Sequence, residues 1–109
     1  MAFVLDTKAE TAAISVANPV TLAYTCGAGT KLLILLVSGQ DNTARTGGTP
    51  TYNLADMTIA DSARAGAAEC TAEIWYKINP TTGSEQTISV PNTGLINLRL
   101  HAISFTTTY

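Results

Sequence analysis

The sequence predicts an all-β protein, an antiparallel β-sandwich built from about eight short strands in one domain. Apolar and polar residues alternate over short segments that glycine, proline and asparagine separate at regular intervals, which is typical of a sandwich. Thr, Ser, Asn and Gly fill the polar positions, and charged residues make up only 13% of the chain, about half the usual share. A chain of 109 residues is long enough for one hydrophobic core and too short for two.

The central element is the segment 31–38 (KLLILLVS), in which six consecutive aliphatic residues are flanked by glycines on both sides. It is too short to span a bilayer as a helix, which takes about 20 apolar residues, so we expect a strand buried on both faces. One face of each sheet in a two-layer sandwich meets water, so we expect loops or another subunit to cover the second face. The two faces are Leu32, Ile34 and Leu36 on one side and Leu33, Leu35 and Val37 on the other.

The segments before this strand show weaker alternation. Residues 3–6 predict an edge strand or a projecting arm, so we divide the chain into an N-terminal arm, 1–10, and a sandwich domain, 11–109. Residues 13–17 and 20–25 each alternate apolar and polar side chains and are separated by an Asn-Pro pair, which predicts two half-buried strands.

After the central strand the chain becomes polar. Residues 40–50 (QDNTARTGGTP) predict a long exposed loop, and loops carry function more often than strands do. Residues 51–52 and 57–59 predict a small hairpin whose turn uses Asn53 and Asp56. The small residues of 62–68 indicate a flexible connector.

Residues 69–78 (ECTAEIWYKI) form the second strong strand pattern, with Ile74, Tyr76 and Ile78 on the face opposite to Trp75. One of the two adjoining aromatic residues must lie in the core. Glu73 and Lys77 share the face of Trp75, so we expect Trp75 at the surface, as a protein contact or a sugar-stacking platform.

The C-terminal part predicts two more strands. Residues 79–83 (NPTTG) form a turn in which Gly83 accepts a positive φ, and residues 86–90 form a short strand. Residues 95–105 alternate until Ile103 and Phe105 reverse the phase, which predicts a β-bulge near Ala102.

The order of several short motifs resembles a jelly-roll-like β-sandwich domain that recurs in tailed-phage virion proteins and in some secreted bacterial proteins. The resemblance covers about residues 18–90 and implies a non-catalytic structural or adhesive module without fixed catalytic residues. The chain ends at Thr106-Thr-Thr-Tyr109, where longer relatives continue with further strands, and this favours pairing with a neighbour. The motifs are Gly27-Ala-Gly-Thr30, Met57-Thr-Ile59, Ser62-Ala-Arg-Ala-Gly66, Glu73-Ile-Trp-Tyr76 and Asn79-Pro-Thr-Thr-Gly83.

The residues that could carry chemistry are few. His101 is the only histidine and has no evident nucleophile or orienting acid, so we expect no enzyme activity and no cofactor. Cys26 and Cys70 lack the spacing of a zinc site, and we expect free thiols or, after release to an oxidising environment, a disulfide. Acidic loop residues such as Asp41 and Asp56 lack the spacing of a calcium site, so we expect no bound metal.

Charge patterning argues against nucleic-acid binding, since the net charge is -2 and the six basic residues are scattered along the chain. The first eight residues contain no basic segment followed by a long apolar one, so we expect synthesis in the host cytoplasm and no membrane association.

We therefore expect a virion structural protein, a phage capsid decoration (cement) subunit or a head or tail attachment, that acts as a symmetric oligomer. The expected partners are further copies of the chain, as a trimer, and the major capsid or another virion protein. The alternative is a carbohydrate-binding adhesive module. The expected partner-binding residues are Phe3, Val4 and Leu5 in the arm, Asp41, Asn42 and Arg45 in the loop, and Trp75.

Overall fold

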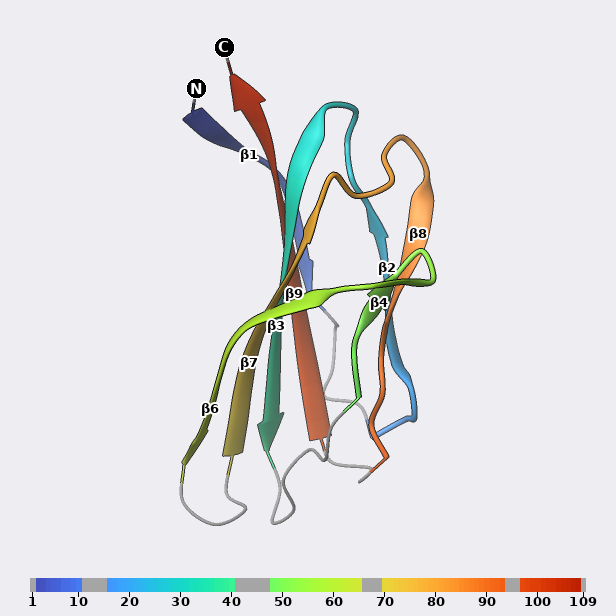
Figure 1. Ribbon diagram of the computed structural model, residues 1–109. Helices are drawn as coiled ribbons and strands as arrows, with labels where there is room; N and C mark the ends of the chain where they lie inside the picture. The colour runs from blue at the N-terminus through green and yellow to red at the C-terminus, as the bar shows by residue number, and fades with distance from the viewer. Residues whose placement is uncertain (1, 11–15, 41–47, 66–69, 94–96, 109) are drawn as a thin grey trace.

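The computed structural model describes residues 2–10, 16–40, 48–65, 70–93 and 97–108, which form two antiparallel sheets packed face to face (Figure 1). The predicted all-β sandwich is confirmed, with nine strands and no helix among the described residues. The strands are β1 (Ala2–Glu10), β2 (Val20–Thr25), β3 (Thr30–Gln40), β4 (Thr51–Tyr52), β5 (Ala55–Asp56), β6 (Thr58–Ala65), β7 (Cys70–Ile78), β8 (Glu85–Val90) and β9 (Asn97–Thr108).

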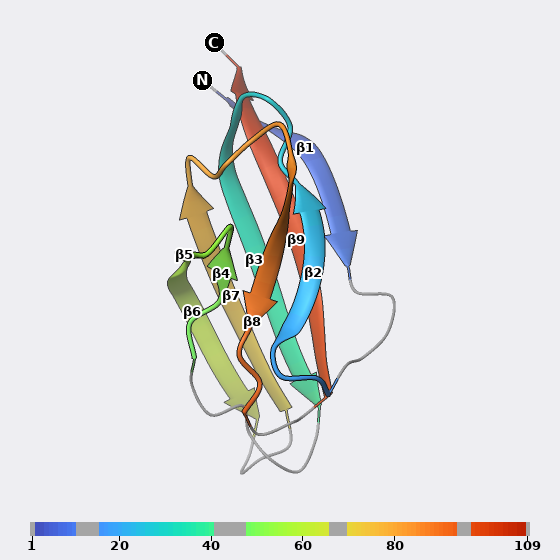
Figure 2. The same cartoon turned by 90° about the vertical axis from the view of Figure 1, so that its right-hand side faces the viewer.

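The strand pairing is nested in the manner of a jelly roll. β1 pairs with β9, β2 with β8, β3 with β7 and β4 with β5, and successive pairs alternate between the two sheets. The five-stranded sheet has the order β1-β9-β3-β7-β6, and the four-stranded sheet has the order β2-β8-β4-β5 (Figure 2). This is the double-sheet arrangement of jelly rolls, with β6 added at one edge, so the expected jelly-roll-like fold is confirmed.

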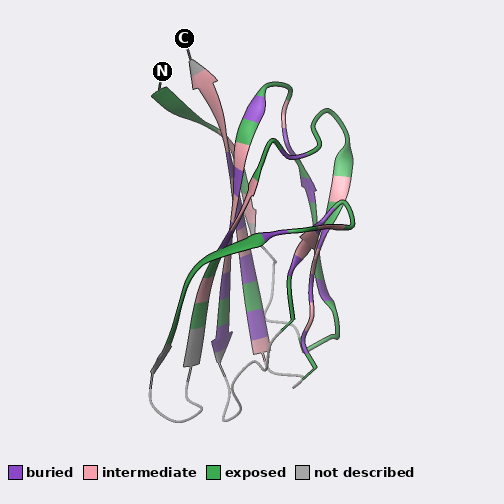
Figure 3. Cartoon of the chain, in the orientation of Figure 1, coloured by how far each residue is buried: buried purple, intermediate pink, exposed green. Residues whose placement is uncertain are grey.

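The core lies between the inner faces of the two sheets, as the buried positions in Figure 3 show. β3 is the middle strand of the larger sheet, and its Leu33, Leu35 and Val37 are at most 1% exposed. The other fully buried large side chains of the core come from both sheets and are Val20, Tyr52, Ile88, Val90, Leu98 and Leu100.

The opposite face of β3 corrects one expectation. Its alternation is as predicted, but Leu32, Ile34 and Leu36 are only half-buried, so the strand is not buried on both faces. The reason is the layer order, because the four-stranded sheet packs on the inner face of the five-stranded sheet only.

Two other expectations about strands were wrong. Residues 62–65 belong to β6 rather than to a connector, and 66–68 lie outside the described residues. Small and polar residues suit this edge strand, since an edge needs little apolar burial. The predicted bulge at Ala102 is absent from β9. Every second residue from Leu98 to Ser104 points inward without interruption, and Phe105 faces outward. The register shifts lie opposite Phe105 instead, in β1 and in β3.

The other strand, turn and loop predictions are confirmed in part. Residues 20–25 form β2 as predicted, whereas 13–15 lie outside the described residues and 16–17 are not in a strand. The predicted hairpin joins 51–52 to 55–56 rather than to 57–59. Its turn consists of Asn53 and Leu54, both at positive φ, so Asp56 lies in β5 instead. Gly83 has the expected positive φ of 84°. Of the predicted loop 40–50, the part 41–47 lies outside the described residues.

Candidate interaction surface

The outer faces of the two sheets differ in chemistry. The four-stranded sheet is apolar inside and polar outside, which is usual for an antiparallel sheet with one wet face. Its outward residues on β2 and β8, which face each other in register, are Thr21 and Ser89, Ala23 and Thr87, and Thr25 and Glu85.

The five-stranded sheet is apolar on its outer face as well. Strand register places its outward side chains in three cross-strand rows. From β1 toward β6 the first row is Leu5, Phe105, Leu32 and Ile78; the second is Lys8, Ile103, Ile34, Tyr76 and Thr58; the third is His101, Leu36, Ile74 and Asp61, and the backbone of Glu10 pairs with His101 at its β1 end. We call the nine apolar or aromatic members the outer apolar face: Leu5, Leu32, Ile34, Leu36, Ile74, Tyr76, Ile78, Ile103 and Phe105.

Much of the outer apolar face is open to water. Ile78 is 63% exposed and Ile74 is 42% exposed, while Leu32, Ile34 and Leu36 are half-buried by their neighbours in the sheet. Strands lie about 4.8 Å apart and outward side chains recur about every 6.8 Å, so four strands and three rows span about 400 Å² in projection. The largest apolar patch on an ordinary monomer measures roughly 300–600 Å² of accessible surface, and such a patch often marks a contact site.

The end of β1 extends this surface. Phe3, Val4 and Leu5 are all exposed, and the Phe3 ring packs edge-on against Phe105 with ring centroids 6.4 Å apart. β1 is an edge strand that pairs with β9 from Ala2 to Glu10. The two chain ends lie side by side beyond the rest of the sandwich (Figure 1). Whether these three residues bind a partner remains a prediction.

The expected position of Trp75 was wrong. Its side chain is only 8% exposed and belongs to the core, and its Nε1 donates a 2.7 Å hydrogen bond to Oε1 of Glu73. Tyr76, expected in the core, lies on the outer apolar face. Trp75 was expected at the surface because Glu73 and Lys77 lie on the same face of the strand. Both charged side chains can lie near the inner face because each has a hydrogen-bond partner there: Glu73 accepts the indole N–H, and Lys77 donates to the carbonyl oxygen of Asp56. The other three expected contact residues, Asp41, Asn42 and Arg45, lie outside the described residues.

A polar cluster that the sequence did not reveal joins the two sheets near the chain ends. Oδ2 of Asp6, the extra residue of the β1 bulge, accepts hydrogen bonds from Gly27 N at 2.9 Å, Thr30 Oγ1 at 3.0 Å and Ser104 Oγ at 2.9 Å. The hydroxyl of Tyr24 lies 2.9 Å from Ser104 Oγ. The hydrogen bond from the Gly27 backbone, followed by those from the two hydroxyls, holds the pKa of Asp6 below its usual value despite partial desolvation.

The cluster is structural in character. An added Cβ at Gly27 would lie 2.6 Å from Oδ1 of Asp6, so a larger residue there would displace the Asp6 carboxylate from its hydrogen-bond donors. Burial raises the pKa of Tyr24, which therefore keeps its proton and can donate it. A carboxylate that is saturated with donors and has a lowered pKa is poorly suited to accept a proton in catalysis.

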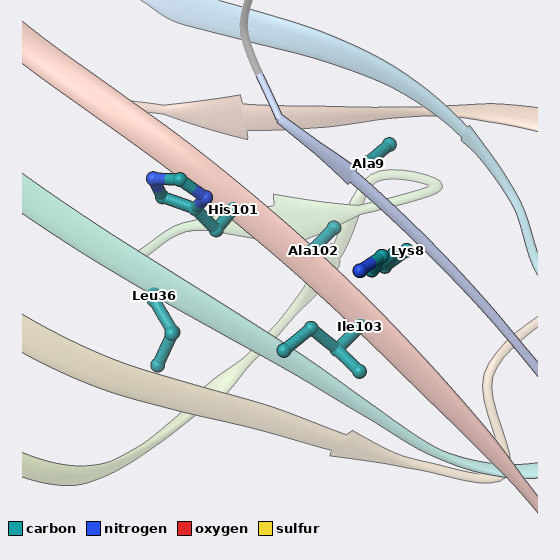
Figure 4. Close-up of a pocket in the computed structure, with 6 residues that line it drawn as sticks. All are labelled: Lys8, Ala9, Leu36, His101, Ala102 and Ile103. Atoms are coloured by element: carbon teal, nitrogen blue, oxygen red, sulfur yellow. The ribbon is translucent and has the colours of Figure 1, made fainter. Parts of the chain in front are cut away.

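Among the described residues, the thiol and the imidazole lie apart. Cys26 is a free, fully buried thiol in the core, and burial raises its pKa, which disfavours the reactive thiolate. His101 lies in a row of the outward face of β9, on the other side of the sheet. It lines a surface hollow of about 400 Å³ together with Lys8, Leu36 and Ile103 (Figure 4). The structure does not describe the side chain of Cys70.

Among the described residues, no group of three or more His, Cys, Asp or Glu side chains could hold a metal ion. In the same part of the chain, no helix has the length and hydropathy needed to cross a membrane. No protein family model, curated protein or solved structure matches the chain.

Proposed function

We propose that the protein is a non-catalytic structural subunit that acts by docking its outer apolar face on a protein partner within a larger assembly. The observation that carries this proposal is the difference between the two sheets. The same chain places Thr, Ser and Glu on the outside of one sheet and Leu, Ile, Phe and Tyr on the outside of the other. A sheet face that stays in water needs no such residues.

The free energy gained by covering the outer apolar face also favours docking. The nine members of the outer apolar face occupy about 300 Å² of the projected area. At about 25 cal/mol per Å², covering them supplies on the order of 7 kcal/mol of gross free energy. That exceeds the lower estimates of the free energy lost when two molecules associate, about 4–15 kcal/mol. Left uncovered, the same surface promotes nonspecific aggregation.

Within this class we propose a virion component, either a capsid decoration subunit or a head or tail attachment, whose partners are further copies of the chain and the major capsid or another virion protein. The motif resemblance and the jelly-roll pairing support this proposal, since jelly rolls occur in viral capsids. Jelly rolls also occur in lectins, so the topology alone does not choose between the two hypotheses. The buried position of Trp75 disfavours the carbohydrate-binding alternative, because it removes the best candidate for a sugar-stacking platform.

Co-sedimentation tests the virion proposal. An antibody against the chain should detect it in the particle band of a density gradient, and immunogold should label the particles. Re-added Ile78→Lys protein should fail to bind stripped particles, whereas Leu54→Lys should bind as the parent does. Leu54 is the matched control because it is 94% exposed but lies in the β4–β5 turn of the other sheet. Protein absent from the particle band would contradict the virion assignment, and full binding of Ile78→Lys would contradict docking through this face.

A further inference from the structure

We propose that a second copy of the chain occupies the outer apolar face, packed sheet on sheet as a two-fold symmetric dimer. This inference rests on the proposed docking role of the face and names its occupant.

The distribution of charge favours a second copy over a different protein. Among the described residues, the charged side chains of the three rows occur only at the row ends, as Lys8 on β1 and Asp61 on β6, and Glu10 holds a row end by register. Positions between β9 and β7 are aliphatic or aromatic, apart from His101. Interfaces between different proteins use charge complementarity to select the partner, whereas homodimer interfaces are more apolar.

The area is close to what a stable dimer needs. A fourth row, formed by Arg99, Ser38, Ala72 and Ala63, borders the three rows and consists mostly of small side chains. The first and fourth rows cover four strands each and the two rows between them cover five, so the four rows span about 590 Å² in projection, and the accessible area of a corrugated face is larger still. A stable interface buries about 800 Å² on each partner. In projection this face supplies about three quarters of that area.

The shape of the face favours the same partner. All antiparallel sheets carry a twist of one hand, and two twisted sheets pack about 10 Å apart with their strands inclined at about 30°. A second copy supplies a face of equal twist and equal length. A two-fold contact of this kind uses the same patch on both molecules and closes at two copies. The trimer expected from the sequence would need two different complementary patches, so the sheet face argues for a dimer.

Analytical ultracentrifugation of the purified chain at micromolar concentrations tests the stoichiometry. The parent should sediment with the mass of two 11.4 kDa chains. Ile74→Lys should weaken dimerisation by about 100-fold, because it buries a charge without a partner across the interface. Its fold should survive, since Ile74 lies directly opposite Asp61 on β6 and the monomer leaves both charged groups in water. In the dimer the same pair would have to be desolvated, which its mutual attraction does not fully offset. Leu54→Lys should remain dimeric.

A second measurement locates the contact. In a mixture of isotope-labelled and unlabelled chains, intermolecular methyl NOEs should connect Ile34, Ile74 and Ile103 of the two copies. A dimer with those NOEs that dissociates in Ile74→Lys supports the inference. A dimer unaffected by Ile74→Lys, or NOEs from other residues, would place the contact elsewhere and overturn it. If Ile74→Lys fails to fold, Ile78→Lys, at a more exposed site on the same strand, replaces it.

A monomeric parent at 100 µM would also overturn the inference. Particle binding would then decide the proposed function alone. If Ile78→Lys abolished particle binding, the face would still dock on a different protein. Particle binding that survives the Ile78→Lys substitution would remove both proposals.

Discussion

Replacing Asp6 by asparagine should destabilise the fold through the polar cluster that joins the sheets near the chain ends. The carboxylate oxygen Oδ2 accepts three hydrogen bonds, from one backbone N–H and two hydroxyls, at 2.9–3.0 Å. Asparagine has nearly the same shape but carries no charge, and one of its two terminal atoms is a donor. The substitution therefore tests the charge of Asp6 while leaving the packing almost unchanged.

The magnitude follows from the number and kind of these bonds. A hydrogen bond to a charged group contributes about 1.5–3 kcal/mol and a neutral one about 0.5–1.5 kcal/mol, so three bonds could lose about 3 kcal/mol. Asp6 is only half-buried and Thr30 has a second acceptor in the carbonyl oxygen of Gly27, 2.7 Å away. Solvent screening reduces the loss to about 1–2 kcal/mol. For a domain of this size the melting temperature should fall by roughly 4–8 °C.

The effect should depend on pH in one direction. The folded-state pKa of Asp6 lies below that of an aspartate in the unfolded chain, mainly because of the hydrogen bond from Gly27. A lowered folded-state pKa stabilises the protein fully above the unfolded-state pKa and loses that contribution as the pH falls through the folded-state pKa. The stability difference between the parent and Asp6→Asn should therefore be constant from pH 7 to about pH 5 and shrink below pH 3.8.

Urea titrations of both proteins at pH 7, 5, 3.5 and 2.5 measure this difference. Asp61→Asn is the matched control, because Asp61 is exposed and its one hydrogen bond runs from the backbone N–H of the adjacent Ser62. The control should change stability by no more than about 0.5 kcal/mol. Equal stability of parent and Asp6→Asn at pH 7, or a difference that persists unchanged at pH 2.5, would refute the role assigned to the Asp6 charge.

Three further changes test the core, the edge strand β1 and the contact between Gly27 and the Asp6 carboxylate. Leu35→Asp should abolish folding, because an unpaired carboxylate in a fully buried site costs several kcal/mol against a total of about 5–15; a cooperative melt by circular dichroism close to that of the parent would count against it. Deleting residues 2–5 should barely shift the melting curve, whereas deleting 2–7 also removes Asp6 and should lower it clearly; equal melting of the two truncations would contradict this. Gly27→Ala should destabilise the parent by more than it destabilises a variant with alanine at position 6, as a double-mutant cycle in urea would reveal.

Local signals allowed much of the fold to be predicted. Residues 20–25 and 86–90 alternate cleanly and form β2 and most of β8, and Gly83 adopts the positive φ that its turn requires. The aliphatic run of β3 identified the middle strand of the larger sheet. Of β6, only residues 58–59 were predicted as strand, because the small residues that follow show no apolar alternation, which an edge strand does not need.

The parts that the sequence could not predict depend on contacts between distant residues. Alternation divides the residues of β7 into two faces but does not say which face is inward. The predicted positions of Trp75 and Tyr76 were therefore the reverse of the observed ones. The cluster around Asp6 joins residues up to 98 positions apart in the chain. One signal was present, because Ser104 follows Leu98, Leu100 and Ala102 at the next inward position of β9 and is polar. A small polar residue that ends an apolar series suggests a buried hydrogen bond.

The central claim is that the outer apolar face is a contact surface, and the most direct test measures whether solvent reaches it in the dissolved protein and in assembled particles. A soluble gadolinium chelate broadens the NMR signals of exposed methyl groups, and the spectra need only methyl labelling of Ile and Leu. At 100 µM protein, the methyl groups of Ile74 and Ile78 should be protected, that of Leu54 should broaden strongly, and dilution should expose the first two. Broadening of Ile74 and Ile78 equal to that of Leu54 at every concentration, with and without assembled particles, would contradict the claim that this face is a contact surface.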